Sequence, residues 1–185
     1  MITQQKMSIV AAYESSMGLP EGSLLDVMIF ETSGTLDVDI KNHYSGATGL
    51  IQFMPATASG LGTSTALLAQ MTFEQQMVYV QAYFKPYLSK LRNSKDPFDV
   101  YCAVLYPKLI GQPDTTLFAV KDTKIYQQNN PLDENKDGKI TKLEIRTKFY
   151  RIINKYRRNA NIPIRKPDWI VPTLIIAGLL IAGNI

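Results

Sequence analysis

The chain has 185 residues, of which 45% are hydrophobic, and it carries a formal net charge of +4. This length suffices for one domain with its own core plus an appendage, and it excludes two domains of full size. The single cysteine, Cys102, excludes an internal disulfide, so packing or a bound metal must stabilise the fold.

Charge is distributed unevenly along the chain. Residues 1–138 contain 10 Lys and Arg against 14 Asp and Glu, whereas residues 139–166 contain 10 Lys and Arg against Glu144 alone. A basic, partner-facing surface is therefore predicted in the C-terminal part. The first residues hold no apolar run long enough for a secretory signal, so ordinary export is not expected.

The first part of the chain has the periodicity of helices. Apolar residues from Met7 to Tyr13 predict a first helix, and those from Leu24 to Ile29 predict a second, which begins near Pro20. This second helix is expected to stop at Gly34, because glycine readily takes the left-handed conformation that ends helices.

Further helices are expected downstream. Residues 71–91 begin with Thr72 and Gln75, which form a plausible capping box, and Pro86 should kink or break that helix. Residues 97–106 and 113–120 each open with a proline at a position allowed in a first helical turn, which predicts two short helices. Residues 1–128 are thus interpreted as one compact helical domain.

Glu31 is the candidate catalytic residue. It falls in the last turn of the second helix, where the helix dipole disfavours a negative charge, and its neighbours Ile29 and Phe30 are apolar. Both effects raise the pKa of a carboxyl group. A carboxylic acid that stays protonated near neutral pH suits general-acid chemistry on a glycosidic oxygen.

The segment SGATGLIQFMPATASG, residues 45–60, is the candidate substrate wall. Its glycines allow a sugar to approach the backbone closely, and Gln52 offers both a donor and an acceptor to sugar hydroxyl or acetamido groups. The structural alternative is that Glu31 is an ordinary surface charge at a helix end.

The ordered set ETSG, SGATGLIQFMPATASGLG, MTFEQQMVYVQAYF and YCAVLYPKLIG resembles the catalytic domain of phage-type lytic transglycosylases, members of the lysozyme superfamily. The similarity runs from about Leu24 to Ala119. It implies a mainly α fold, that is, a lysozyme-like α+β domain with a minimal β element. It also implies that Glu31 is the acid/base. The substrate-binding residues that it implies are Ser33, Ser45, Gly49, Gln52 and Tyr106. At Tyr106 the chain reads VLYP and lacks the Asn of the family's Ala-Tyr-Asn motif.

The resemblance also implies a mechanism with one carboxyl group, whereas glycosidases normally use two. Glu31 would protonate the leaving oxygen, the substrate's N-acetyl group would assist, and Glu31 would then deprotonate the muramic C6 hydroxyl to close a 1,6-anhydro ring. Asp37 or Asp39 is the alternative second carboxylate of a true hydrolase, although turn roles are favoured for both. His43 either lines the groove or lies in a surface loop.

Residues 133–144, DENKDGKITKLE, match an EF-hand calcium loop. The predicted calcium ligands are Asp133, Asn135, Asp137, the Lys139 carbonyl, Thr141 and Glu144. Gly138 occupies the turn position. Because the segment before the loop is a poor helix, we expect a structural Ca²⁺ brace and not a calcium sensor.

The C-terminal part of the sequence, after residue 139, has two further features. From Ile140 to Tyr156, apolar residues recur at helical spacing between Arg and Lys, which predicts a basic amphipathic helix that packs on the domain or lies on anionic lipid. Residues 169–185 are apolar and uncharged, which predicts a C-terminal transmembrane helix next to the basic segment.

The sequence is therefore interpreted as three parts: a catalytic domain at 1–128, a calcium loop with a basic helix at 129–166, and a transmembrane anchor at 167–185. The predicted function is a peptidoglycan lytic transglycosylase, anchored to the internal membrane of a phage virion. The predicted partners are glycan strands and a lipid membrane. No nucleic-acid partner is expected, because the basic segment lacks interleaved aromatic residues. The alternatives are a muramidase of the same fold and a non-enzymatic, calcium-braced virion protein.

Overall fold

A computed structural model describes residues 1–166 of the chain. These residues form short α-helices, three 3-10 turns and two strands. In chain order the α-helices are α1 (Gln4–Met17), α2 (Ser23–Glu31), α3 (Pro55–Gly60), α4 (Thr65–Leu68), α5 (Phe73–Phe84), α6 (Leu88–Ser94), α7 (Pro97–Leu105), α8 (Lys124–Asn129) and α9 (Lys142–Asn159). The 3-10 turns are η1 (Lys85–Tyr87), η2 (Pro107–Leu109) and η3 (Asn130–Leu132), and the strands are β1 (Leu117–Val120) and β2 (Lys139–Thr141).

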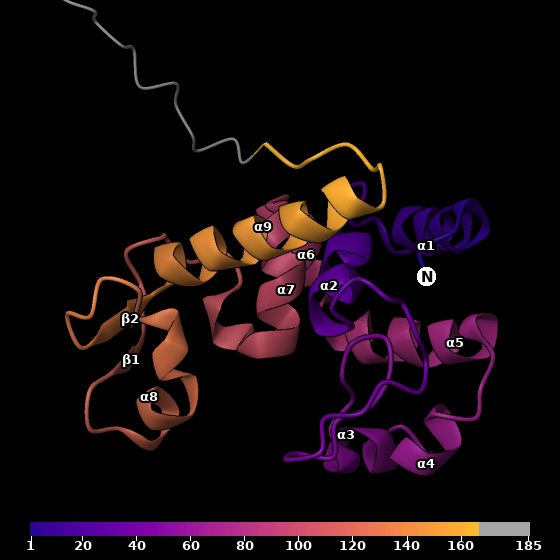
Figure 1. The fold of residues 1–185 in the computed structure, drawn as a ribbon, viewed down its shortest axis with the longest axis horizontal. Coiled ribbons are helices and arrows are strands. Elements are labelled where there is room, and N and C mark those ends of the chain that lie inside the picture. Colours follow the sequence, from indigo (N-terminus) through magenta and orange to yellow (C-terminus); the bar gives the residue numbers. More distant parts are fainter. Residues whose placement is uncertain (167–185) are drawn as a thin grey trace, which may run out of the picture.

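Helix α9 runs along one side of the molecule and spans two groups of elements (Figure 1). Helices α1, α3, α4 and α5 lie toward one end, whereas α8 and the small sheet lie toward the other, with α2 and α7 between them. The sheet is antiparallel, and Ala119 of β1 lies opposite Ile140 of β2. The segment 133–144 is therefore joined to the preceding part of the chain by backbone pairing.

Helix α2 begins at a buried carboxylate from α1. Glu14, which is 3% exposed, accepts hydrogen bonds from the backbone N–H groups of Gly22 (2.7 Å), Leu24 (2.7 Å) and Leu25 (3.1 Å). The N-cap residue Gly22 has no side chain to perform this role, so a distant acid satisfies N–H groups that would otherwise lack partners. This arrangement fixes α2 on α1 and, with it, the position of Glu31 at the other end.

An aromatic cluster joins α2, α7 and α9. Phe149 of α9 stacks on Tyr101 of α7, with ring centroids 4.6 Å apart, and Phe30 of α2 lies 5.2 Å from Phe149. The apolar stripe of α9 is buried, with Ile145 1% and Ile153 0% exposed. Of the two alternatives for this basic helix, the structure therefore supports packing on the domain.

Ion pairs fasten α9 and the segment that follows it to the rest of the fold. Arg157 lies 2.5 Å and Arg165 lies 2.6 Å from opposite oxygens of Asp26 on α2. Arg146 lies 2.6 Å from Asp96, just before α7. Part of the positive charge after residue 138 is thus paired with acidic groups within the fold.

The expected helices at the start of the chain are confirmed, as is the capping box of Thr72 and Gln75. Pro86 lies in η1, which separates α5 from α6. The helix expected at 113–120 is wrong, because Leu117–Val120 form β1. Strand β2 supplies hydrogen-bonding partners that the local pattern did not reveal.

The expected fold class needs a correction. The chain is mainly α with a two-stranded sheet, which agrees with part of the expectation. The predicted transmembrane helix is not part of this fold: across residues 1–166, no helix has the length and apolar character that a membrane crossing requires. The segment for which it was predicted, 167–185, lies outside the described residues.

Candidate functional site

Glu31 is the last residue of α2, and its side chain is half-buried. Burial raises the pKa of its carboxyl group to about 8. No hydrogen bond or ion pair to this carboxyl is present among residues 1–166, so nothing offsets the loss of solvent. The local neighbourhood therefore holds a carboxylic acid in its neutral, proton-donating form at pH 7.

Tyrosines from two helices lie near Glu31. Its charge contributes to raising the pKa of Tyr83 on α5 and of Tyr101 on α7, although burial is the larger cause for both. The Tyr83 hydroxyl donates a hydrogen bond of 2.9 Å to the carbonyl of Ala103 on α7, and its ring meets Phe53 edge-on. Tyr83 thus connects α5, α7 and the segment after Gly49 beside the acid.

Gln52 has a left-handed backbone, with φ of 51°. Its side-chain Nε2 donates hydrogen bonds to the carbonyls of Ile40 (3.2 Å) and Gly49 (3.1 Å). The amide nitrogen is therefore used within its own loop, and its Oε1 accepts no hydrogen bond from residues 1–166. This oxygen is the part of Gln52 that can receive a ligand donor.

Three other predicted substrate-binding residues lie on the turn after α2, in the loop before α3 and directly after α7. Ser33 is exposed in the turn after Glu31, with φ of 51°. Ser45 is exposed, and its Oγ accepts a hydrogen bond from the Ala47 N–H. Tyr106 follows α7 and packs edge-on against Phe118 of β1. Within the described residues, none of the three forms a hydrogen bond to Glu31.

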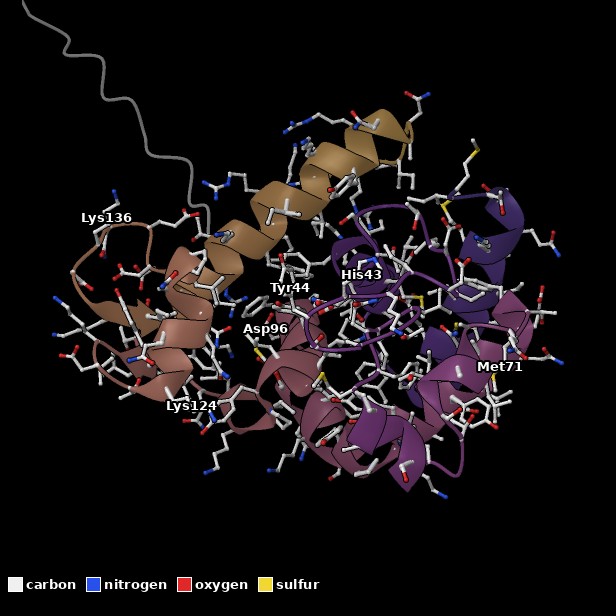
Figure 2. The ribbon with its side chains drawn as sticks, turned by 60° about the horizontal axis from the view of Figure 1, so that its bottom comes forward. His43, Tyr44, Met71, Asp96, Lys124 and Lys136 are labelled. Carbon is white, nitrogen blue, oxygen red and sulfur yellow. The ribbon has the colours of Figure 1, made fainter. Side chains whose placement is uncertain are left out.

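The alternative acid and base residues have other surroundings. Asp37 lies 3.4 Å from the N-terminal amine and 3.9 Å from the Lys6 Nζ, so it serves to fasten the start of the chain. Asp39 and His43 are exposed. His43 lies beside Tyr44 on the same loop, and Figure 2 labels both residues. No contact among residues 1–166 connects these side chains to Glu31.

The loop 133–144 is closed by its own hydrogen bonds. Asp133 Oδ2 accepts from the Tyr126 hydroxyl (2.6 Å) and the Gly138 N–H (3.0 Å). Asn135 Oδ1 accepts from the Asp137 N–H, and Asp137 Oδ1 accepts from the Lys139 N–H, each at 2.8 Å. These bonds hold the segment in a tight turn.

Within the part of the chain that the structure describes, two oxygens of this loop lack hydrogen-bond partners. Asp133 Oδ1 and Glu144 Oε1 are buried and have no hydrogen-bond donor within residues 1–166. They belong to the first and the twelfth positions of the loop, which both bind the ion in an EF-hand. Across the described residues, however, no three Asp, Glu, His or Cys side chains are grouped as a metal site. The fit to Ca²⁺ therefore depends on the two unpartnered oxygens together with amide, hydroxyl and carbonyl ligands.

Two residues beside the candidate site were not predicted from the sequence. Tyr83 was interpreted only as part of an apolar helix face. Gln76 is fully buried on the same helix and bonds to the segment that precedes Gln52. The available signal was its spacing, because Gln76 falls on the same helix face as Phe73, Met77 and Val80, where a polar side chain is exceptional.

Comparison with known proteins gives no relative: no protein-family model, no curated protein and no solved structure matches the chain.

Proposed function

We propose that the chain is a peptidoglycan lytic transglycosylase that cleaves the β-1,4 bond between N-acetylmuramic acid and N-acetylglucosamine. The observation that carries this proposal is the half-buried Glu31, which has no hydrogen-bond or ion-pair partner within residues 1–166 and whose pKa is raised to about 8. A neutral carboxylic acid at pH 7 is the group that protonation of a glycosidic oxygen requires.

The proposed reaction uses Glu31 twice. Its proton passes to the oxygen of the leaving N-acetylglucosamine as the bond to muramic C1 breaks, and the carbonyl oxygen of the muramic N-acetyl group bonds to C1. The Glu31 carboxylate then takes the proton of the muramic C6 hydroxyl. The C6 oxygen attacks C1 and displaces the acetamido oxygen, which yields the 1,6-anhydro product and restores the acid form without consuming water.

The surroundings of the nearby acids support a one-carboxylate mechanism. Asp37 is engaged with the N-terminal amine and Lys6, and Asp39 is exposed. Hydrolysis by the two-carboxylate route would need a second acid held across the bond from Glu31. The loop that contains Gln52 would bind sugar through the Gln52 Oε1 and its glycine backbone.

We further propose that loop 133–144 holds a structural Ca²⁺. Asp133, Asn135, Asp137, Thr141, Glu144 and the Lys139 carbonyl would hold it. When bound, the ion would supply positive charge to the buried oxygens Asp133 Oδ1 and Glu144 Oε1, which have no hydrogen-bond partner within residues 1–166. Glu144 Oε2 also accepts from the Thr141 N–H at 2.8 Å and so caps α9, which makes the loop a brace for that helix.

The test is mass spectrometry of the muropeptides that the full chain releases from purified peptidoglycan. Glu31→Gln removes the acid with little change in shape, and Glu74→Gln on the exposed side of α5 is the matched control. Anhydro-muramyl ends that Glu31→Gln abolishes and Glu74→Gln preserves would support the proposal. Reducing ends would indicate a muramidase and would direct mutagenesis to Asp37 and Asp39. No release from the calcium-loaded chain would indicate a non-enzymatic protein.

A further inference from the structure

Gln76 connects three separate backbone segments from inside the core. Its side chain is 0% exposed, and its Oε1 accepts a hydrogen bond of 2.7 Å from the Leu50 N–H. Its Nε2 donates to the carbonyls of Val38 (3.0 Å) and Leu68 (2.9 Å). Both amide hydrogens and one acceptor position are thereby used, which is what a buried amide needs to avoid a desolvation penalty.

Two of these bonds reach the glycine loop, which we define as residues 38–54. This loop turns back on itself through bridges between Lys41 and Thr48 and between Thr48 and Phe53. Val38 stands at its start, and Leu50 lies two residues before Gln52. Gln76 therefore fixes the loop at both sides of its turn.

Gly49 lets the loop approach Gln76 this closely. A Cβ atom on Gly49 would lie 2.8 Å from the amide carbon of Gln76, a distance that side chains do not tolerate. Its φ of 84° is also one that glycine adopts without strain. The glycine that the sequence suggested for sugar approach is thus required, in this fold, for contact with Gln76.

Helix α5 connects the glycine loop to the acid. Tyr83 follows Gln76 by seven residues, which places both on one face of the helix two turns apart. One turn of α5 holds Leu50 through Gln76. The other turn holds α7, because the Tyr83 hydroxyl donates a hydrogen bond of 2.9 Å to the Ala103 carbonyl. Tyr101 of α7 packs on Phe30, the residue before Glu31, with ring centroids 4.8 Å apart. Helix α5 therefore links the loop that contains Gln52 to the helices that surround Glu31.

We infer that Gln76 is a positioning residue that holds the sugar-binding glycine loop in register with Glu31. This inference rests on the proposed function, because it assigns Gln76 to the same glycan site. It also explains why an amide occupies a core position of α5. An apolar residue would fill the space, but it would leave the Leu50 N–H and two carbonyls without partners.

The test begins with Gln76→Glu, which preserves the shape of the side chain and an acceptor for the Leu50 N–H. It removes both amide donors, so a carboxylate oxygen then faces the carbonyls of Val38 and Leu68. Gln81→Glu is the control, because it makes the same chemical change on the exposed side of α5. Kinetics on a purified glycan oligosaccharide and amide hydrogen exchange at Leu50 are measured for the full chain.

We expect Gln76→Glu to raise KM at least about tenfold with kcat changed less than about threefold, and to speed exchange at Leu50. At lower pH a protonated carboxyl regains one donor, so the ratio of variant to wild-type KM should fall. Gln81→Glu should match the wild type in each measurement. A folded Gln76→Glu with unchanged KM, or with reduced kcat alone, would overturn the inference.

A second variant keeps the inference testable if Gln76→Glu does not fold. Gly49→Ala adds a methyl group that would meet the Gln76 side chain, whereas Gly111→Ala adds one at a similar φ (74° against 84°) where no atom outside its chain neighbours lies within 4 Å. Only Gly49→Ala should raise KM, and an unchanged KM would contradict the inference. If the wild-type chain cleaves no glycan, the proposed function fails separately. Amide exchange at Leu50 then tests whether Gln76 holds the glycine loop. Faster exchange in either Gln76→Glu or Gly49→Ala supports that role, and wild-type protection in both variants rejects it.

Discussion

Lys142, at the start of α9, donates a hydrogen bond of 2.5 Å to Asp99 of α7, and both side chains are 1% exposed. Asp99 also accepts from the Gly111 N–H at 2.7 Å, and Lys142 also donates to the Gln112 carbonyl at 2.9 Å. This pair joins α9, which begins within the segment 133–144, to α7, the helix that contains Tyr101. Helix α7, whose Tyr101 lies near Glu31, is therefore connected to the segment 133–144 through a buried charge pair.

Removing one partner of this pair should be costly. Lys142→Met leaves the Asp99 carboxylate buried without its counter-charge, and we expect the free energy of unfolding to fall by about 3–5 kcal/mol. Arg151→Met is the control, because it removes an exposed pair with Glu134 and should cost less than about 1 kcal/mol. Urea unfolding of both variants measures the difference, and equal small losses would show that the buried pair contributes little.

The activity should depend on the acid form of Glu31. With its pKa at about 8, the carboxyl is protonated below that pH and loses its proton above it. We therefore expect kcat/KM on peptidoglycan fragments to fall about tenfold per pH unit above pH 8, since this profile reports the free enzyme. A fall that begins near pH 4.5, the ordinary value for glutamate, would show that Glu31 is solvated.

The same group should make stability depend on pH. The folded pKa is raised from 4.5 to about 8, so between these values the folded state holds a proton that the unfolded state has lost. Stability should fall as pH rises through this window, by at most about 1.4 kcal/mol per pH unit, and should level off outside it. Thermal melts of Glu31→Gln should lack this slope, whereas Glu74→Gln should retain it. Parallel slopes in all three proteins would contradict the assignment.

Calcium should stabilise the fold through Glu144. At a Ca²⁺ concentration about 100 times the dissociation constant, binding to the folded state adds about 2.7 kcal/mol, so the melting temperature should rise. Glu144→Gln keeps an acceptor for the Thr141 N–H but loses the charge, and its response should be largely lost. Glu134→Gln removes a charge from the same loop at a position that is not a ligand, and it should respond as the wild type does. An equal rise in both variants would exclude Glu144 as a ligand.

Features set by neighbouring residues could be predicted from the sequence. Three features depend only on side chains that are close together in the chain, within about a dozen residues. They are the capping box at Thr72, the helix end at Glu31 and the ligand spacing of residues 133–144. The apolar stripe of α9 is also a local pattern, although its partner is not. These features supplied the candidate acid and the candidate calcium ligands.

Features that need a distant partner were settled only by the tertiary structure. Arg157 and Asp26 are 131 residues apart in the chain, and Gln76 and Leu50 are 26 residues apart. Residues 117–120 were expected to be helical, yet they form a strand because Lys139–Thr141 supply its hydrogen-bonding partners. A local pattern fixes which side chains share a face, but burial and hydrogen bonding depend on what packs against that face. For the same reason, the sequence suggested an acid at residue 31, and only the fold determined how far burial raises its pKa.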